Sequence, residues 1–188
     1  MTRIALFASG SGSNVENIVR YFQQHKEVDF TKVYCNKPDA YVLERAKNLG
    51  VKTRIFNKEE FSQSNTIVEE LKNEQTDLII LAGFLWKIPS SLVQAFPNKI
   101  VNIHPALLPK YGGKGMYGMH VHEAVVANKE TETGITIHYV NEHYDEGPAI
   151  FQAHVALTPS DTPTDVANKI HQLEFEHFPK VIEMLIKK

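Results

Sequence analysis

The stretch "IVNIHPALLPKY", which begins at Ile100, places two polar side chains at the end of an apolar run. Asn102 and His104 stand where further Val or Ile residues would extend a buried strand. Residues two apart in a strand point to the same face, so the amide and the imidazole face one site. Two convergent donors suit an oxyanion that develops on a carbonyl carbon. The alternative is a hydrogen-bonded polar pair that holds the following loop.

A carboxylate in the loop "YVNEHYDEGP" is the second candidate for chemistry. Asp145 lies in this short loop between two expected strands. A carboxylate beside His104 would favour the imidazolium form, because opposite charges stabilise each other. The alternative is a turn Asp, which is common next to Gly and Pro.

The stretch "ASGSGSN" follows the first expected strand and opens a helix. Gly12, Ser13 and Asn14 would present backbone N–H groups at the helix N-terminus, where anions bind. The third glycine position of a dinucleotide fingerprint holds Val15, and the Gly-Lys-Ser/Thr of a P-loop is absent. The stretch therefore indicates a site for a single phosphate, with an ordinary strand-to-helix turn as the alternative.

The stretch "FLWKIPSS" follows the fourth expected strand. Leu85, Trp86 and Ile88 form an apolar rim there, and Trp86 is the single tryptophan of the chain. This pattern suits a flat aromatic ligand, although packing within the core would explain it equally.

The histidines are the residues to check for a transition-metal site. Nine histidines are present, and His120 and His122 lie close together. The chain has no HExxH motif and no pair of cysteines. Residues two apart do not share a helix face, so we expect no metal site.

The elements that must position these residues alternate between strand and helix. Hydrophobic patterns predict strands at 3–9, 30–36, 51–56, 77–84, 99–105, 134–140 and 149–157, and helices at 15–24, 40–50, 64–73, 89–96, 121–128 and 162–188. This alternation predicts one α/β domain, residues 1–188, with a mostly parallel central sheet. The short connection between the last two strands predicts an antiparallel pair in the C-terminal half. In such sheets ligands bind beyond the carboxyl ends of the strands.

The final helix carries signals for its start and for an interruption. Thr162 is the expected N-cap, and Pro163 occupies the first helical position. Pro179 is expected to kink or break the helix, because proline removes a backbone donor.

Composition excludes several classes of protein. The chain has 188 residues, 43% hydrophobic, with a formal net charge of −2 and no long Lys/Arg run that would mark a nucleic-acid or membrane surface. No segment approaches the ~18 apolar residues of a membrane span. A single cysteine, Cys35, excludes an internal disulfide and fits a reducing cytoplasm. We expect a soluble cytoplasmic protein with no nucleic-acid or membrane partner.

Five motifs occur together in order: "FASGSGSN", "LAGF", "NIHPALLPKY", "GITIHYV" and "YDEGP". Over essentially the whole chain this set resembles the folate-dependent phosphoribosylglycinamide formyltransferase family of purine synthesis. The resemblance implies a single-domain, Rossmann-like formyltransferase fold. It also implies formyl transfer from 10-formyltetrahydrofolate to the amine of phosphoribosylglycinamide, without a metal or a covalent enzyme intermediate.

The resemblance assigns roles to residues already identified. Asn102 and His104 would stabilise the developing oxygen anion, and Asp145 would keep His104 charged. The ribonucleotide substrate would be bound by Gly12, Ser13, Asn14, His171 and Glu174. The folate would lie against Leu85, Trp86, Lys87, Ile88, Asn102, Asn141, Glu142, His143, Tyr144 and Asp145.

The chain departs from the family at two places near the folate. "LWKI" has Trp86 where many members carry an arginine, with Lys87 beside it. The upstream arginine of the family has no match in "FNKEEFSQSN". The glycine-rich stretch around 112–119 is expected to be a mobile loop over the site, with Lys114 directed to anionic groups.

Four other functions remain as alternatives. Methionyl-tRNA formyltransferase would add an RNA-binding domain, and formyltetrahydrofolate hydrolase would add a regulatory domain. A sugar-nucleotide N-formyltransferase and a non-catalytic nucleotide-binding module would share the fold. The non-catalytic module would not require Asn102, His104 and Asp145 together, whereas a formyltransferase would. A monomer and a homodimer are both compatible with the sequence.

Overall fold

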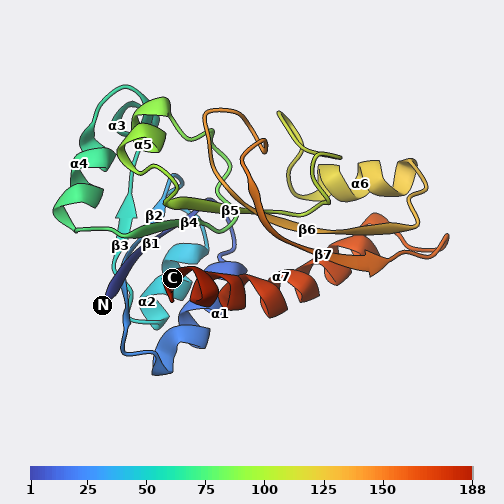
Figure 1. The fold of residues 1–188 in the computed structure, drawn as a ribbon, viewed down its shortest axis with the longest axis horizontal. Helices are drawn as coiled ribbons and strands as arrows, with labels where there is room; N and C mark the ends of the chain where they lie inside the picture. The colour runs from blue at the N-terminus through green and yellow to red at the C-terminus, as the bar shows by residue number, and fades with distance from the viewer. Residues whose placement is uncertain (188) are drawn as a thin grey trace. The chain divides into compact units, whose positions relative to one another are not determined.

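The computed structural model describes residues 1–187 (Figure 1). The chain divides into two compact units, Met1–Asn102 and Ile103–Lys188. The first unit contains β1 (Thr2–Ala8), α1 (Ser13–Tyr21), the 3-10 turn η1 (Phe22–Gln24), β2 (Val28–Cys35), α2 (Val42–Asn48), β3 (Thr53–Ile55), α3 (Lys58–Ser62), α4 (Thr66–Asn73), β4 (Leu78–Leu81), α5 (Ser90–Ala95) and most of β5 (Ile100–His104).

The strands of the first unit are all parallel and follow the order β3-β2-β1-β4-β5. Leu81, the last residue of β4, pairs with Phe7 on one side and with Asn102 on the other. The carboxyl ends of β1, β4 and β5 therefore lie at one edge. Figure 1 shows α1 and α2 on one side of this sheet and α3, α4 and α5 on the other.

Helices on both sides explain why these strands read as continuous apolar runs. Residues Ile4–Ala8 of β1 are fully buried, and all four residues of β4 are buried. Phe7 stacks on Tyr34 of β2, with the ring centroids 4.8 Å apart. The core of the first unit is therefore centred on β1.

The helix α3 is absent from our sequence-based expectations, although a local signal for it exists. The Asn57 side chain accepts a hydrogen bond from the Glu60 N–H at 2.9 Å, and the Glu60 carboxylate accepts one from the Asn57 N–H at 2.9 Å. This reciprocal capping box fixes the first turn of a short helix. The expected helix at 64–73 is observed at Thr66–Asn73.

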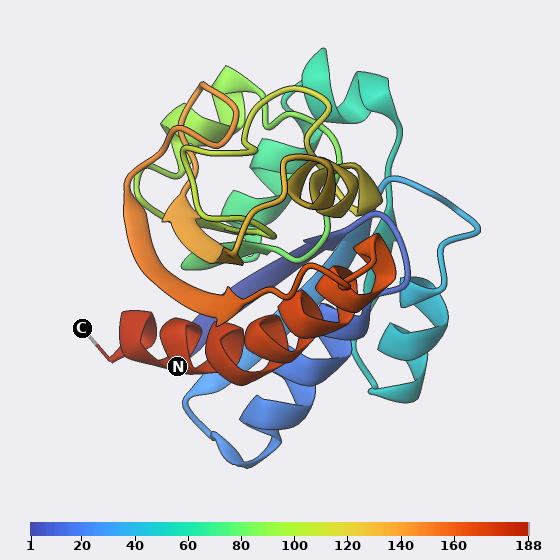
Figure 2. The same cartoon turned by 90° about the vertical axis from the view of Figure 1, so that its right-hand side faces the viewer.

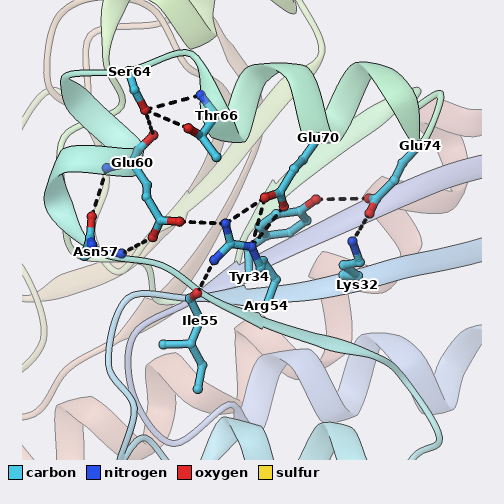
Figure 3. Close-up of polar contacts among 10 residues, drawn as sticks. All are labelled: Lys32, Tyr34, Arg54, Ile55, Asn57, Glu60, Ser64, Thr66, Glu70 and Glu74. Atoms are coloured by element: carbon cyan, nitrogen blue, oxygen red, sulfur yellow. Dashed lines mark hydrogen bonds and ion pairs between the residues drawn. The ribbon is translucent and has the colours of Figure 1, made fainter.

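A network of polar contacts centred on Arg54 ties α3 and α4 to the edge strand β3 (Figure 3). Arg54 Nη2 lies 2.8 Å from Glu60 Oε1 and 2.7 Å from Glu70 Oε1. The Tyr34 hydroxyl donates to Glu74 at 3.0 Å, and Lys32 forms an ion pair with the same carboxylate. Burial is the main reason why the pKa of Tyr34 is raised, and the arginine lowers the pKa of Glu60.

The second unit contains α6 (Met119–Ala127), β6 (Glu132–Tyr139), β7 (Ala149–Ala156) and α7 (Pro163–Ile186). β6 and β7 are antiparallel, which confirms the predicted pair. α7 packs against α6, β6 and β7, and Figures 1 and 2 show it running alongside the strand pair. Together with the parallel strands of the first unit, this confirms the predicted fold class.

The start of α7 agrees with prediction, whereas the helix does not break at Pro179. Thr162 caps the helix and forms a capping box with Asp165, with Pro163 in the first turn. The helix continues through Pro179, so the predicted break at this residue is wrong. Phe178, Pro179 and Val181 are buried, and this packing offsets the lost backbone hydrogen bond.

No helix within residues 1–187 combines the length and the apolar character needed to cross a membrane.

Candidate active site

The turn after β1 has the backbone geometry of an anion site. Gly12 adopts a left-handed conformation, with φ 75° and ψ 22°, and is the N-cap of α1. A side chain there would collide with Val42. Since glycine has no side chain to cap the helix, the first N–H groups of the helix, including those of Ser13 and Asn14, point to any anion at this end.

The α2 segment holds this turn from behind. The Val42 N–H donates to Gly10 O at 3.1 Å, and Arg45 Nε donates to Ser11 O at 2.8 Å. Arg45 also forms an ion pair with Glu16, and hydrogen bonds from Arg20 and Arg45 lower the pKa of that carboxyl. One backbone contact and one side-chain contact from the α2 segment thus fix the turn, and neither occupies the N-terminus of α1.

The segment after β4 joins the same edge of the first unit. Ser9 N donates to Gly83 O at 3.1 Å, and Leu85 N donates to Ser9 Oγ at 3.0 Å. Leu85 is 42% exposed, whereas Ile88 is buried in the core. Of the three residues of the predicted apolar rim, Leu85 is therefore exposed and Ile88 belongs to the core.

Trp86 belongs to an aromatic cluster in the first unit. Its ring centroid lies 6.0 Å from that of Phe56, 5.9 Å from Phe61 and 6.3 Å from Phe84. The indole remains partly exposed, and the neighbouring Lys87 is exposed. The packing alternative accounts for one part of the Trp86 surface, and the remainder is accessible.

At the end of β5, His104 is almost fully buried, and its ring orientation is defined. His104 Nε2 lies 2.7 Å from Tyr111 O. A carbonyl oxygen only accepts, so Nε2 carries the proton. Asn102 lies two residues earlier in the same strand and is partly exposed.

Asp145 lies between two imidazoles in the second unit. Its Oδ2 is 3.6 Å from His104 Nδ1, and its Oδ1 is 3.8 Å from His138 Nε2. The Gly113 N–H donates to Oδ2 at 2.9 Å. Both imidazole distances exceed a direct hydrogen bond, so the carboxylate influences the rings chiefly through its charge.

His138 is the residue of this cluster that sequence reasoning missed. It lies near the carboxyl end of β6 and is 2% exposed. Its Nδ1 lies 3.0 Å from Tyr139 O, and burial lowers its pKa despite the nearby Asp145. The lowered pKa favours the uncharged form of His138 at neutral pH. The signal was a polar residue late in the apolar run "GITIHYV".

The loop that carries Asp145 is compact. Asn141 Oδ1 accepts from the His143 N–H at 2.9 Å, and a side chain at Gly147 would collide with Tyr139 O. Asp145 itself has a positive φ of 54°. The remaining folate candidates of this loop, Glu142, His143 and Tyr144, are exposed.

The two candidates on α7 differ in exposure. Glu174 is buried, which is unusual for a carboxylate and requires compensating contacts. His171 is exposed and stacks on Phe175, with the ring centroids 6.2 Å apart. They lie three residues apart on one helix and therefore share a face.

No group of three or more His, Cys, Asp or Glu side chains within residues 1–187 is arranged to hold a metal ion. His120 and His122 lie in the first turn of α6, where His120 is exposed and His122 is buried.

Comparisons with known proteins identify the family to which the chain is similar. The formyl transferase family matches residues 2–182. The chain is 37% identical to phosphoribosylglycinamide formyltransferase of Bacillus subtilis, over 99% of this chain and 95% of that protein. It is 38% identical to the chloroplastic phosphoribosylglycinamide formyltransferase of Arabidopsis thaliana, but spans only 64% of that protein's length.

Solved structures show the same similarity. Glycinamide ribonucleotide transformylase 1 from Geobacillus kaustophilus is 37% identical and superimposes with a TM-score of 0.89, with 98% of each chain covered. Phosphoribosylglycinamide formyltransferase from Streptococcus pneumoniae is 36% identical, with a TM-score of 0.87 and 99% of each chain covered.

Proposed function

The chain belongs to the formyl transferase family, and from that premise we propose that it transfers the formyl group of 10-formyltetrahydrofolate to the amine of N1-(5-phosphoribosyl)glycinamide in purine biosynthesis. The observation that carries the proposal is the His104–Asp145 pair, with 3.6 Å between Nδ1 and Oδ2. The names of the bacterial relatives, which match over nearly their full lengths, support the choice of substrate.

The proposed chemistry begins with attack by the substrate amine on the formyl carbon. The new C–N bond forms as the carbonyl electrons move to oxygen. The amide of Asn102 and the Nδ1–H of His104 donate hydrogen bonds to this oxygen. Nδ1 is assigned because the geometry places Nε2 against Tyr111 O.

Collapse of the tetrahedral intermediate completes the transfer. The carbonyl re-forms, the bond to N10 of the folate breaks, and N10 takes a proton while the attacking nitrogen loses one. Asp145 stabilises the His104 imidazolium and directs the proton transfer through water, since its oxygens lie beyond direct hydrogen-bond reach of the rings. The enzyme needs no nucleophile of its own, because the substrate supplies the amine.

We assign the substrate phosphate to Gly12, Ser13 and Asn14. The left-handed Gly12 and the start of α1 support this assignment. His171 and Glu174 are assigned to the rest of the ribonucleotide, on the basis of the resemblance alone.

We assign the folate to two segments, one in each unit. The first is Leu85–Ile88, where the exposed Leu85 and the partly exposed Trp86 offer apolar surface. The second is the Asn141–Asp145 loop, whose backbone groups supply hydrogen bonds. No metal enters the proposed reaction.

We further propose that residues 1–188 form a single formyltransferase domain that works in the cytoplasm as a monomer or a homodimer. The family match across both units supports the single domain. The free, buried thiol of Cys35 fits a reducing compartment. Its substrates are small molecules, and neither a nucleic acid nor a membrane is a partner.

The direct test mixes the purified chain with 10-formyltetrahydrofolate and phosphoribosylglycinamide and follows the folate absorbance and the formylated product. We expect stoichiometric product, dependent on the amine substrate, and almost none with His104→Ala. Folate deformylation without the amine would instead identify a hydrolase. Transfer only to an amino sugar nucleotide would also overturn the proposal.

A further inference from the structure

We propose that Tyr111 is a positioning residue for His104, and that the turn Tyr111–Gly113 sets the spacing between the imidazole and the carboxylate of Asp145. The inference rests on the proposed function, because it concerns the residues to which that function assigns the chemistry. All the residues involved lie in the second unit.

The inner side of this turn contacts both reacting groups. The Tyr111 carbonyl lies 2.7 Å from His104 Nε2. Two residues later, the Gly113 N–H donates to Asp145 Oδ2 at 2.9 Å. The same Oδ2 faces His104 Nδ1 at 3.6 Å. One short stretch of backbone therefore holds the far side of the imidazole and one oxygen of the carboxylate.

The carbonyl contact decides which edge of the ring faces Asp145. A half-turn of the imidazole would exchange Nδ1 and Nε2 with ring carbons, and both polar contacts would be lost. The hydrogen bond to Tyr111 O favours one orientation and places the proton on Nε2. Nδ1 is then the nitrogen left for the formyl oxygen.

The backbone of this turn does not favour that geometry by itself. Tyr111 has φ 57°, in the left-handed region that residues other than glycine seldom adopt. Gly113 has φ 95°, and a side chain at Gly112 would meet Leu108 Cδ2 at 2.6 Å. A left-handed tyrosine between such neighbours requires an additional contact to hold it.

The phenol of Tyr111 supplies that contact on the outer side. Its hydroxyl donates to Glu130 Oε1 at 2.7 Å and accepts from Asn128 Nδ2 at 2.9 Å. The Tyr111 hydrogen bond is the main cause of a lowered pKa of Glu130, so the acceptor is ionised at neutral pH. Asn128 and Glu130 are fixed to the end of α6, because their N–H groups donate to Ala124 O and Val125 O.

A chain of contacts thus runs from the end of α6 through the Tyr111 side chain and backbone to His104. Loss of the phenol anchor would leave the backbone carbonyl free to relax, and the imidazole with it. Misplacement of a catalytic group costs turnover more than it costs substrate binding.

The test compares Tyr111→Phe, which removes only the hydroxyl, with two matched changes. Lys110→Gln is the control, because Lys110 also contacts Glu130 Oε1, at 3.3 Å, without reaching the phenol. Glu130→Gln keeps an acceptor for the Tyr111 hydroxyl, whereas Glu130→Ala removes it. Thermal unfolding shows that each variant is folded before activity is measured.

Two readouts separate positioning from a general structural role. We expect kcat of Tyr111→Phe to fall about tenfold, with KM for both substrates within about twofold of wild type. The ¹⁵N NMR signal of the protonated His104 Nε2, identified by its absence in His104→Gln, should shift as its hydrogen bond to the Tyr111 carbonyl weakens. Lys110→Gln and Glu130→Gln should stay near wild type in both readouts, and Glu130→Ala should follow Tyr111→Phe.

A folded Tyr111→Phe with wild-type kcat and unchanged His104 signals would overturn the proposal. If Tyr111→Phe does not fold, the comparison of Glu130→Gln with Glu130→Ala tests the proposal instead. Equal kcat values and equal His104 signals in these two variants would contradict a positioning role for Tyr111. Failure of the proposed function is distinguishable, because the wild-type chain would then lack formyl transfer while the NMR comparison would still report on the turn.

Discussion

Two polar clusters in this molecule pair carboxylates with basic side chains, at different distances. Around Arg54, the carboxylates of Glu60 and Glu70 lie 2.7 to 2.8 Å from a guanidinium nitrogen. Around Asp145, the two imidazoles lie 3.6 and 3.8 Å away. In the first cluster each charge is neutralised by direct contact. In the second, no direct hydrogen bond joins the rings to the carboxylate.

On the proposed function, the first cluster stabilises the fold and the second is prepared for chemistry. Direct, charge-assisted hydrogen bonds at Arg54 hold α3 and α4 against β3 (Figure 3). The wider spacing at Asp145 leaves a donor on His104 for a substrate oxygen or a water molecule. Changes in the first cluster should therefore affect stability, and changes in the second should affect turnover.

The largest expected effect follows from removal of the imidazole. His104→Ala should lower kcat by about 10²–10³, the usual cost of losing an oxyanion donor, while the protein remains folded. Steady-state kinetics with both substrates, alongside circular dichroism, checks this. Near-normal turnover would assign Asn102 and His104 to the structural alternative.

The second prediction concerns whether the catalytic residues act as one unit. The double variant Asn102→Ala/His104→Ala should lose far less than the product of the two single losses, because both donors serve the same oxygen. The four kcat/KM values of this cycle give the answer. Losses that multiply would mean that the two side chains act on separate steps.

A third, smaller effect concerns stability at acid pH. His122 lies in the second unit, and burial lowers its pKa from 6.5 to about 4, assisted by the charges of His171 and His104. Its Nδ1 has no hydrogen-bond partner among residues 1–187. In the unfolded chain His122 binds a proton below about pH 6.5, whereas in the folded state it does so only near pH 4. The free energy of unfolding should therefore fall as the pH drops from 6.5 toward 4.

The size of this effect is at most about 3 kcal/mol for a single group. Urea unfolding at pH 7 and pH 5 measures it, and His122→Gln should reduce the difference between the two pH values. His120→Gln, an exposed histidine on the same helix, is the control and should behave as wild type. Equal pH sensitivity in His122→Gln would remove His122 from the account.

The smallest effect is expected at the stabilising cluster. Arg54→Met should lower the unfolding temperature by a few degrees, at roughly 2–4 °C for each kcal/mol in a protein of this size. Its kcat should remain within about twofold of wild type, because none of its contacts involves an assigned catalytic residue. A large loss of turnover at full stability would erase the distinction between the clusters.

The sequence predicted the strands well, because buried parallel strands have apolar runs that local reasoning detects. It missed α3, since five residues give no periodicity and only the Asn57–Glu60 capping pair marks the start. It also predicted a break at Pro179 that the packing around this residue prevents. Local rules fail there because tertiary contacts decide the outcome.

The sequence identified candidate site residues by their types, but it could not show which of them lie close together in the fold. Asn102 and His104 stood out because polar groups are unusual near the end of an apolar strand, and Asp145 was chosen as a loop carboxylate that could reach His104. His138 did not, since one histidine in a strand is compatible with simple packing. The role of the Tyr111 carbonyl was not predictable, because every residue has a carbonyl and only the folded turn shows where this one lies.

The pH dependence of formyl transfer by Asp145→Asn tests the central claim most directly. The claim is that the Asp145 carboxylate, 3.6 Å from His104 Nδ1, stabilises the imidazolium that donates to the formyl oxygen during the transfer step. The account predicts that the variant has a lower maximal rate and loses activity at a lower pH than wild type as the pH rises. A variant whose profile coincides with that of wild type in both rate and pH dependence would contradict it.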